Sequence, residues 1–487
     1  QNSLADLSNQ TLSEERMEKI VVGILTMSDG RKYLHDAFTE INMEYQHGIA
    51  RALEKTGRFR VVEGTQPLNT NEVAKTEAKR LAENGVEVTI FNYAIWCYPQ
   101  FTAVAQNFAP GPYLLFSNLH PSECGMVGML AAAGTLDQLG VHYKRLWGSI
   151  ENPIIFDKVC SYLKSVAAVK RLRGLTFGNF GGRPLGMYTA IANTEQWQRE
   201  FGIDVENLEQ ENIVRAGETI PEEKVEAALR FLEKNVGKIH YDGKQLTREK
   251  LKLQIRSYYG LKQIIEDKKL DFIGIKAHGD LTDSYVTMDI AEAFLNDPYD
   301  FDGAKEPIVA ATESDMDGAL TMQLFKHLTG LPVLFADVRH YDAENDVWYF
   351  SNSGTHATYF AGASMNAAEN LRQVELFPET EDFPAGGASV QHFAKAGKVT
   401  LARLSRKNGK YRMTIVPAEI VTYEREKMKA MSSQTTPEWP VAFTKLQVSA
   451  DRLLEEYPCN HIHGIYGDYV REMVDIAKIL GIEYVIL

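Results

Sequence analysis

The stretch "ATESDMDGALTMQLFKHLTGLPVLFADVRHY", residues 311–341, has the pattern of a strand, a helix and a second strand. One acidic residue follows each apolar run, Glu313 after "PIVAAT" and Asp337 after "LPVLFA". Because ligands of open parallel sheets bind outside the carboxyl ends of the strands, this pattern predicts that both carboxylates lie at a ligand site. Each also has a plainer interpretation as the cap of the next helix, and Asp315 and Asp317 compete for that position.

Two carboxylates that converge on one point repel each other unless a proton or a cation lies between them. A third candidate ligand occurs in "YPCNHIHGIYGD", where His461 and His463 lie between a turn marked by proline and a helix. Two carboxylates and one imidazole with open positions suit a hard or borderline divalent ion such as Mn²⁺ better than structural zinc. The residues therefore predict a divalent-metal site, with either histidine as its third ligand.

The rest of the chain predicts two α/β domains with parallel sheets, followed by a β-rich, barrel-like C-terminal domain. Strand and helix patterns alternate from "KIVVGILTMSDG" to "VEVTIFNYA", and a second α/β unit begins at "VKRLRGLTFGNFGG" and ends with "LPVLFADVRHY". Short β-like runs follow, among which "RKNGKY" predicts a hairpin. The expected domains are residues 1–167, 168–341 and 342–487.

Composition argues against several classes of protein. With 44% hydrophobic and 24% charged residues among 487, the chain is typical of globular proteins. A net charge of −13 argues against nucleic acid or anionic membranes as partners. No apolar run approaches the roughly 20 residues of a membrane span. Four scattered cysteines without a CxxC motif, and the polar start "QNSLADLSNQTLSEERMEK", predict a cytoplasmic protein.

Eight short stretches give the chain a resemblance to a known family. They are "SDGR" (28–31), "IWCY" (95–98), "GGRPLGM" (181–187), "ATESD" (311–315), "FADVRHY" (335–341), "SNSG" (351–354), "PEWP" (437–440) and "CNH" (459–461). In these stretches and their order the chain resembles the L-fucose isomerase family, within the L-fucose/L-arabinose isomerase superfamily of aldose–ketose isomerases. The separation of 337 − 313 = 24 residues between the two carboxylates is also that of the family.

The resemblance implies an intramolecular oxidoreductase that converts an aldose into a ketose without nicotinamide or flavin. It implies that Glu313, Asp337 and His461 bind Mn²⁺, or another divalent cation such as Co²⁺ or Mg²⁺. Glu313 and Asp337 would also be the catalytic acid/base pair that moves a proton between C2 and C1 through a cis-enediol. The cation would stabilise the negative charge that develops on the two sugar oxygens. A metal-assisted hydride shift is the competing mechanism.

The resemblance also implies contacts to a small-molecule sugar. The expected substrate-binding residues are Arg31, Trp96, Arg183, Leu185, His278, Ser353, Gln391, Trp439 and Asn460. Trp96 matches a tryptophan that reaches into the active site of a neighbouring subunit, and Trp439 matches one that forms a pocket wall. The protein is therefore expected to be a homo-oligomer, a hexamer or a trimer, with a shared active site.

Departures from the family pattern bear on the substrate. Leu185 stands where the family often has Met, "KAHGDLTDSY" replaces a segment containing Gln and Trp, and "GGASVQHF" lacks an aromatic residue. These departures argue against L-fucose itself as the substrate. The expected substrate is a 6-deoxy or 6-substituted hexose, or a related pentose. A first alternative is an anionic sugar such as sulfoquinovose, isomerised to sulfofructose and bound by cations from among Arg31, Arg183, Lys276, His278 and His392. A second alternative is a non-catalytic sugar-binding module.

Overall fold

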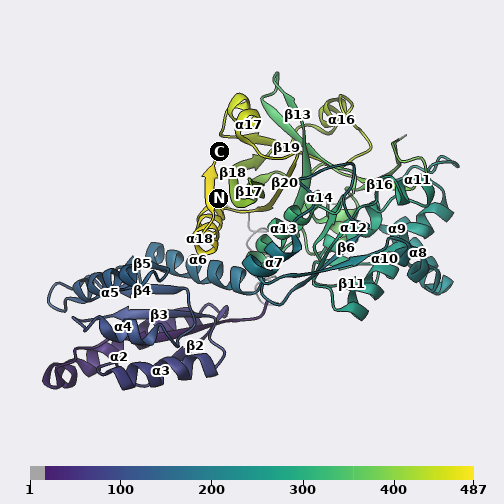
Figure 1. Cartoon of the computed structure of the whole chain (residues 1–487). Coiled ribbons are helices and arrows are strands. Elements are labelled where there is room, and N and C mark those ends of the chain that lie inside the picture. The colour runs from purple at the N-terminus through teal and green to yellow at the C-terminus, as the bar shows by residue number, and fades with distance from the viewer. Residues whose placement is uncertain (1–16, 355, 381) are drawn as a thin grey trace. The chain divides into compact units, whose positions relative to one another are not determined.

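A computed structural model describes residues 17–354, 356–380 and 382–487. Most of the polar start, on which the expectation of a non-secreted protein rested, lies outside these residues. The chain divides into two compact units, an N-terminal unit that ends at Lys170 and a C-terminal unit that comprises residues 171–487 (Figure 1). Among the described residues, no helix combines the length and the apolar character needed to cross a membrane.

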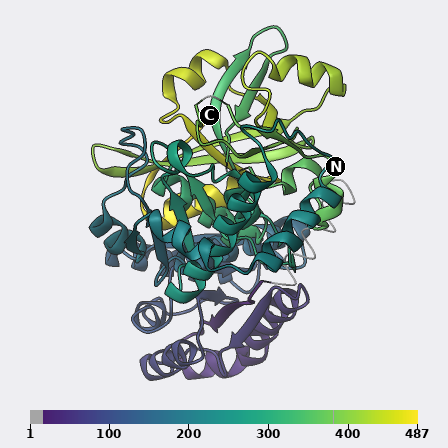
Figure 2. The same cartoon turned by 90° about the vertical axis from the view of Figure 1, so that its right-hand side faces the viewer.

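The N-terminal unit is a parallel sheet between layers of helices (Figures 1 and 2). In spatial order its strands are β2 (Phe59–Glu63), β1 (Ile20–Thr26), β3 (Val88–Tyr93), β4 (Tyr113–Ser117) and β5 (Tyr143–Trp147). Its helices are α2 (Lys32–Glu54), α3 (Asn71–Glu83), α4 (Gln100–Ala105), α5 (Gly125–Leu139) and α6 (Pro153–Lys170). Every residue of β3 is buried, as is typical of a central strand covered on both faces.

Helix α3 illustrates how the sequence places a helix on this sheet. The side chain of Thr70 accepts a hydrogen bond from the Val73 backbone N–H at 3.2 Å, so it satisfies one of the donors left unpaired at the helix start. Ala74, Ala78 and Leu81 are buried at helical spacing and share a core with the strands. One apolar stripe therefore fixes which face of the helix meets the sheet.

The C-terminal unit contains a second parallel sheet with helices around it. In spatial order its strands are β12 (Ala310–Thr312), β9 (Phe272–Ile275), β6 (Thr176–Phe180) and β7 (Asp204–Leu208). The helices of this part are α7 (Thr194–Phe201), α8 (Glu211–Glu218), α9 (Glu222–Asn235), α10 (Arg248–Lys268), α11 (Leu281–Ser284), α12 (Asp289–Asn296) and α13 (Met316–Thr329). Helix α10 contributes many of the apolar side chains in the hydrophobic core of this α/β part.

The second half of this unit is a mixed, mainly antiparallel sheet. In spatial order its seven strands are β17 (Gly397–Lys407), β20 (His461–Tyr466), β13 (Leu334–Asp342), β14 (Val347–Ser351), β19 (Val441–Leu446), β18 (Lys410–Ile420) and β21 (Glu483–Ile486). An additional pairing of β17 with β18 closes the sheet into a barrel and leaves β21 outside the ring. The predicted hairpin is confirmed, with positive φ at Asn408 and Gly409 between β17 and β18.

Short elements complete the C-terminal unit. They are β8 (Lys238–Ile239), β10 (Tyr299–Asp300), β11 (Gly303–Ala304), α14 (Tyr359–Gly362), α15 (Ala367–Leu371), β15 (Glu375–Pro378), β16 (Ala388–Gln391), α16 (Arg425–Ser432), α17 (Ala450–Glu456) and α18 (Val470–Leu480). Two α/β parts with parallel sheets and a barrel-like C-terminal part confirm the predicted fold class.

One expectation about the fold was wrong. We expected Glu313 and Asp337 at the ends of two strands of one parallel sheet, but only β12, which precedes Glu313, belongs to that sheet. Strand β13 contains Asp337 and pairs antiparallel with β14 and β20, so residues 334–341 are part of the barrel. The apolar run of β13 is compatible with either sheet, and its partners are set by distant parts of the chain.

Candidate metal and active site

Glu313, Asp337 and His461 converge although they come from two different sheets. His461 begins β20 and lies directly opposite Asp337 of β13 in the antiparallel register. Its Nε2 atom is 3.0 Å from Oε2 of Glu313 and 3.4 Å from Oδ1 of Asp337. The exposed fractions of the side chains are 1% for His461, 10% for Glu313 and 19% for Asp337, so the cluster is shielded from bulk water.

A strained turn brings Glu313 to this point. Glu313 and Ser314 follow β12 with φ values of 54° and 46°, in the left-handed region. That region costs of order 1–3 kcal/mol for a residue with a side chain, and it persists only where the surroundings enforce it. The Ser314 N–H donates to the Ile275 carbonyl at 2.9 Å, and its hydroxyl donates to Oδ1 of Asn179. Hydrogen bonds to β9 and β6 thus hold the turn.

Asp315 fixes the orientation of His461 from behind. It is the N-cap of α13, where its side chain accepts from the Gly318 N–H at 2.9 Å. Its carboxylate also accepts from Nδ1 of His461 at 2.7 Å and from the guanidinium of Arg403, which is fully buried on β17. Because Nδ1 donates to Asp315, Nε2 is left for the two other carboxylates, as in carboxylate–histidine–metal arrangements.

The electrostatics of the cluster favour positive charge at its centre. Burial alone would lower the pKa of His461, but the hydrogen bond to Asp315 and the nearby carboxylate of Glu313 raise that pKa well above its ordinary value. Burial would likewise raise the pKa of Glu313, but His278 and His461 lower it to about 2. The pKa of Asp337 is raised, mainly by burial. A proton or a metal cation would each supply the positive charge that these groups favour.

The donor set fits a hard or borderline divalent cation. Nε2 of His461 is buried and makes no hydrogen bond of acceptable geometry within the described residues, although two carboxylate oxygens face it. Adjacent ligands of an octahedral ion with bonds of about 2.1 Å are about 3 Å apart, close to the spacings found here. Among the described residues, no three His, Cys, Asp or Glu side chains are arranged with the geometry of a formed metal site. The fit therefore lies in the type and convergence of the ligands.

Polar side chains surround the two carboxylates. Nε2 of His278 is 3.5 Å from Oε1 of Glu313. Nδ2 of Asn352 donates to Oδ2 of Asp337 at 3.1 Å. Nδ2 of Asn460 lies 3.5 Å from Oδ1 of Asp337. Of the predicted substrate contacts, His278 and Asn460 are therefore placed at the carboxylates.

Aromatic rings continue from this cluster to Trp439. The ring of His278 lies 5.0 Å from that of Phe383, which meets the buried indole of Trp439 edge to face at 6.1 Å. The guanidinium of Arg339 lies over the same indole at 4.8 Å, two residues beyond Asp337 in β13. The indole is thus fixed between a cation and an aromatic edge.

The other predicted contacts of this unit lie in three places. Ser353 is buried directly after Asn352. Arg183 is exposed and lies over the ring of Tyr188 at 4.7 Å, and Leu185 is 66% exposed in the same loop. Gln391 is buried in β16, outside the barrel sheet.

Arg31 and Trp96 belong to the N-terminal unit. They follow the adjacent strands β1 and β3, and the two loops are joined where the Tyr98 N–H donates to the Ser28 carbonyl at 3.3 Å. The guanidinium of Arg31 pairs with both oxygens of Asp29, and Trp96 is half-buried. The two residues thus share one edge of the sheet, outside the carboxyl ends of its strands.

Two of the predicted cations do not supply free positive charge. Nζ of Lys276 pairs with Oδ2 of Asp280 at 2.7 Å. Burial lowers the pKa of His392 to about 4, so this histidine is neutral at pH 7. Sequence alone could not reveal either fact, because both depend on neighbours and burial.

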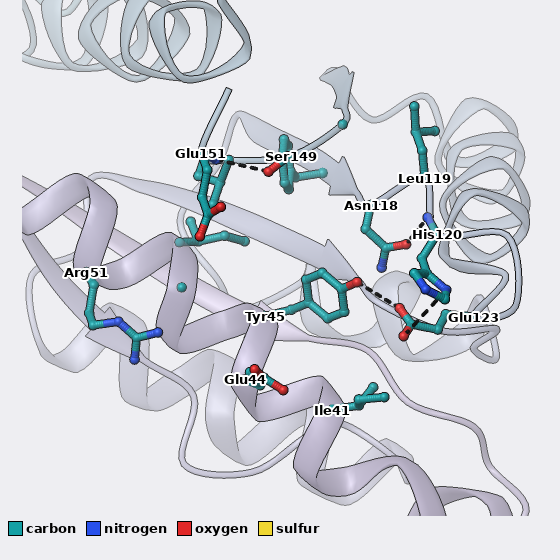
Figure 3. A pocket seen from close by; sticks show the side chains of 15 residues that line it. Ile41, Glu44, Tyr45, Arg51, Asn118, Leu119, His120, Glu123, Ser149 and Glu151 are labelled. Atoms are coloured by element: carbon teal, nitrogen blue, oxygen red, sulfur yellow. Dashed lines mark hydrogen bonds and ion pairs between the residues drawn. The ribbon is translucent and has the colours of Figure 1, made fainter. Parts of the chain in front are cut away.

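A separate pocket lies in the N-terminal unit (Figure 3). Its volume is about 580 Å³, and it lies between α2 and the loops that follow β4 and β5. The Tyr45 hydroxyl donates to Oε2 of Glu123 at 2.8 Å across this pocket, and His120 lies beside the same carboxylate. None of the residues that sequence reasoning singled out lines it.

Sequence reasoning missed several residues of the site. Asp315 was considered only as a helix cap, Asn352 and Arg339 lie in stretches that carry the family resemblance but were given no role, and Arg403 and Phe383 gave no recognisable signal. The repeated acidic residues of "TESDMD" could have suggested a residue that supports the ligands. Arg403 could not have been found, because it reaches Asp315 from a strand 88 residues away.

Comparison with known proteins covers most of the chain. Residues 19–174 match the first N-terminal domain of L-fucose isomerase, residues 271–330 match the second N-terminal domain, and residues 350–487 match the C-terminal domain. L-fucose isomerase of Bacteroides thetaiotaomicron is 23% identical over 95% of this chain and 92% of its own length. The corresponding enzyme of Citrobacter koseri is 22% identical over 92% of this chain and 87% of its own length.

L-fucose isomerase of Escherichia coli is 25% identical over 66% of this chain and 60% of its own length. The matches to the first N-terminal, second N-terminal and C-terminal domains follow one another along the chain, and the Bacteroides thetaiotaomicron relative aligns over 95% of it. The chain therefore belongs to the L-fucose isomerase family and is an aldose–ketose isomerase that acts on a sugar.

Proposed function

We propose that this enzyme isomerises its sugar by proton transfer at a divalent cation held by Glu313, Asp337 and His461. The observation that carries the proposal is the convergence of the buried Glu313 and the half-buried Asp337 on Nε2 of His461, an atom without a hydrogen-bond partner in the described chain. Mn²⁺ fits this mixture of oxygen and nitrogen ligands, and Co²⁺ or Mg²⁺ are alternatives. When bound, the cation supplies Lewis-acid stabilisation of the developing negative charge on the substrate oxygens.

The protein groups have distinct tasks in this mechanism. Asp315 keeps Nε2 of His461 aimed at the site. Glu313 and Asp337 form the acid/base pair: one takes the proton from C2 and the other manages the exchange that returns a proton to C1 through a cis-enediol. Asn352 holds one oxygen of Asp337 in place.

We propose a neutral 6-deoxy or 6-substituted hexose, or a related pentose, as the substrate. The names of the relatives, all L-fucose isomerases, support a sugar of this class. The pairing of Arg31 with Asp29 and of Lys276 with Asp280 reduces the support for the anionic alternative, sulfoquinovose. Family membership sets aside the non-catalytic alternative.

We further propose a cytoplasmic homo-oligomer, a hexamer or a trimer, in which a neighbouring subunit completes each site. Arg31 and Trp96 would be the residues supplied by the neighbour. Both residues lie at one edge of the sheet, in a unit that has its own hydrophobic core. This supports the proposal that the N-terminal unit of a neighbouring subunit supplies them. The free thiols of Cys97, Cys124 and Cys459 are compatible with a reducing compartment.

One experiment tests the reaction and the substrate together. The enzyme is freed of metal, given Mn²⁺, and incubated in D₂O with L-fucose, D-arabinose or sulfoquinovose, and ketose formation is followed by NMR. The proposal predicts a ketose from one of the two neutral sugars, with deuterium at C1 and only after addition of metal. A ketose without deuterium would indicate a hydride shift, conversion of sulfoquinovose alone would favour the anionic alternative, and activity without metal would contradict the metal site.

A further inference from the structure

Trp439 is held by an acidic group that the proposed mechanism does not use. The Nε1–H group of the indole donates to Oε2 of Glu379 at 3.2 Å, and the Thr380 N–H donates to the same oxygen at 2.9 Å. The other oxygen, Oε1, is buried without a hydrogen-bond partner among the described residues. Glu379 is 3% exposed, so water from the surface does not satisfy that oxygen.

Asp289 shows the same division between its two oxygens. Oδ1 accepts from the hydroxyl of Thr287, and Oδ2 is buried without a partner in the described chain. Asp289 is 2% exposed and lies within hydrogen-bonding reach of Glu379. No Lys, Arg or His of the described residues lies within ion-pair distance of either carboxyl group.

Two adjacent buried carboxylates cannot both remain ionised without a cation. A single proton placed between the pair would satisfy the orphaned oxygen of each group at once. The oxygens that accept from Trp439 and Thr287 would keep their present donors. Unpaired buried oxygens are costly, so this arrangement is strongly favoured over two isolated acids.

We propose that Asp289 and Glu379 share one proton, and that this acid pair is the device that positions the Trp439 indole for the sugar. The inference rests on the proposed function in one respect, the use of Trp439 as a wall of the sugar pocket. Glu379 and Asp289 act through Trp439, so they are positioning residues. The indole is fixed at its edge by Glu379, and Arg339 and Phe383 contact it elsewhere.

Few other charged groups face the pair. Glu292 lies one turn along α12, and its charge acts on Asp289. Lys250 approaches the β15–β16 loop at Gly386, and Arg339 lies over Trp439. The shared proton sets the charge of the carboxyl group that accepts from the Nε1–H group of Trp439. Glu292 is a further buried acid beside the pair, and burial raises its pKa well above the ordinary value.

The pH dependence follows from this arrangement. Burial raises the pKa of Asp289 to about 6 and raises that of Glu379 well above its ordinary value. The pair holds a single proton between its two pKa values, and its hold on Trp439 is lost as pH rises through the higher value and that proton leaves. The two carboxylates then repel each other, and the indole acceptor moves. Sugar binding should weaken, whereas the chemical step at the distant carboxylates should change less.

The test uses full-length enzyme loaded with Mn²⁺ and the sugar that it isomerises. KM and kcat are measured between about pH 6 and pH 9 for wild type, Glu379→Gln and Glu379→Ala. Wild type should show KM rising about tenfold with pH, a change of about 1.4 kcal/mol in binding. The Gln side chain can accept from Trp439 and donate to Asp289 without titrating, so its KM should stay flat. The Ala variant should have a high KM at every pH.

A matched control and a substrate-free readout complete the design. Glu375→Gln removes a partly buried carboxylate of β15, the strand just before Glu379. Glu375 is paired with His240 and Arg425, so this variant should leave the wild-type pH profile intact. Tryptophan emission against pH should shift in wild type and in Glu375→Gln, but not in Glu379→Gln or Trp439→Phe. If Glu379→Gln fails to fold, Asp289→Asn replaces the other acid of the pair. It should give the same KM at every pH.

The outcomes separate this inference from the proposed function. A wild-type pH profile that persists in folded Glu379→Gln or Asp289→Asn would overturn the acid pair. An emission shift that persists in Trp439→Phe would show that another tryptophan reports the titration, and would also overturn it. Failure to isomerise any sugar would contradict the proposed substrate class, whereas the emission measurements would still decide the pair.

Discussion

Two regions of the molecule gather acidic residues, and they differ in what surrounds the carboxylates. In the C-terminal unit, Glu313 and Asp337 are largely buried around His461. In the N-terminal pocket, Glu44 and Glu151 are exposed to solvent. Water already solvates the second pair, so it needs no partner. Burying the negative charges of Glu313 and Asp337 costs free energy unless a proton or a cation balances those charges.

The comparison teaches that burial and bracing distinguish a reactive cluster from a surface depression. Behind His461, the buried ion pair of Asp315 and Arg403 fixes the direction of the imidazole. In the N-terminal pocket, Glu123 is contacted by Tyr45 and His120, and the pocket side chains Glu44, Arg51 and Glu151 are exposed (Figure 3).

The largest effect is expected at the buried cluster. Replacing Glu313 with Gln or Asp337 with Asn should lower kcat by roughly 10²–10⁴-fold, because each variant removes half of the acid/base pair. Glu151→Gln in the N-terminal pocket should leave kcat within about twofold, as expected for an exposed site. Aldose-to-ketose conversion measured by NMR checks both values. Equal losses in the two regions would remove the distinction drawn between them.

The second prediction concerns the bracing pair. Arg403→Met leaves the Asp315 carboxylate buried without its guanidinium, and should lower the free energy of unfolding by about 3–5 kcal/mol. Arg51→Met, at the rim of the N-terminal pocket, should change it by no more than about 0.5 kcal/mol. Urea unfolding followed by circular dichroism provides the comparison. A loss below 1 kcal/mol for Arg403→Met would show that the pair is not needed to hold the site, on the scale of surface pairs.

Metal binding should stabilise one region only. At a Mn²⁺ concentration about 100 times its dissociation constant, the free energy of unfolding should rise by about 2.7 kcal/mol. EDTA should reverse the gain, and His461→Ala should abolish it. Glu123→Gln, in the N-terminal pocket, should retain the full gain. Thermal unfolding with and without the ion detects the effect, and a gain that survives in His461→Ala would place the ion elsewhere.

The smallest effect is expected in the N-terminal pocket itself. Tyr45→Phe removes the hydroxyl that donates to Glu123, a partly buried hydrogen bond worth about 1 kcal/mol. Isomerisation should be unaffected, because this pocket takes no part in the proposed chemistry. A large loss of activity in Tyr45→Phe would show that the pocket is functional after all.

The sequence predicted local features better than the partners of those features. Glu313 could be predicted at a strand end because apolar runs and helix caps are recognised from residues that are adjacent in the sequence. The strand of Asp337 was assigned to the wrong sheet, because periodicity does not reveal whether a buried strand pairs in parallel or antiparallel. Residue types and spacing suggested the ligand set, and the family resemblance selected His461 over His463.

The supporting residues could not be predicted, because their contacts join distant parts of the chain. Arg403 meets Asp315 across 88 residues, and Trp439 meets Glu379 across 60. No local pattern encodes either contact, since both depend on how the barrel closes and packs. The chemistry of a site is thus more visible in a sequence than the bracing that makes it work.

The central claim is that one divalent cation binds at Glu313, Asp337 and His461. Titration of metal-free enzyme with Mn²⁺, followed by electron paramagnetic resonance, tests it most directly. We predict one tight site per chain in wild type and binding weakened by at least about 100-fold in His461→Ala, because one of three protein ligands is lost. Unchanged Mn²⁺ affinity in that variant would contradict the account.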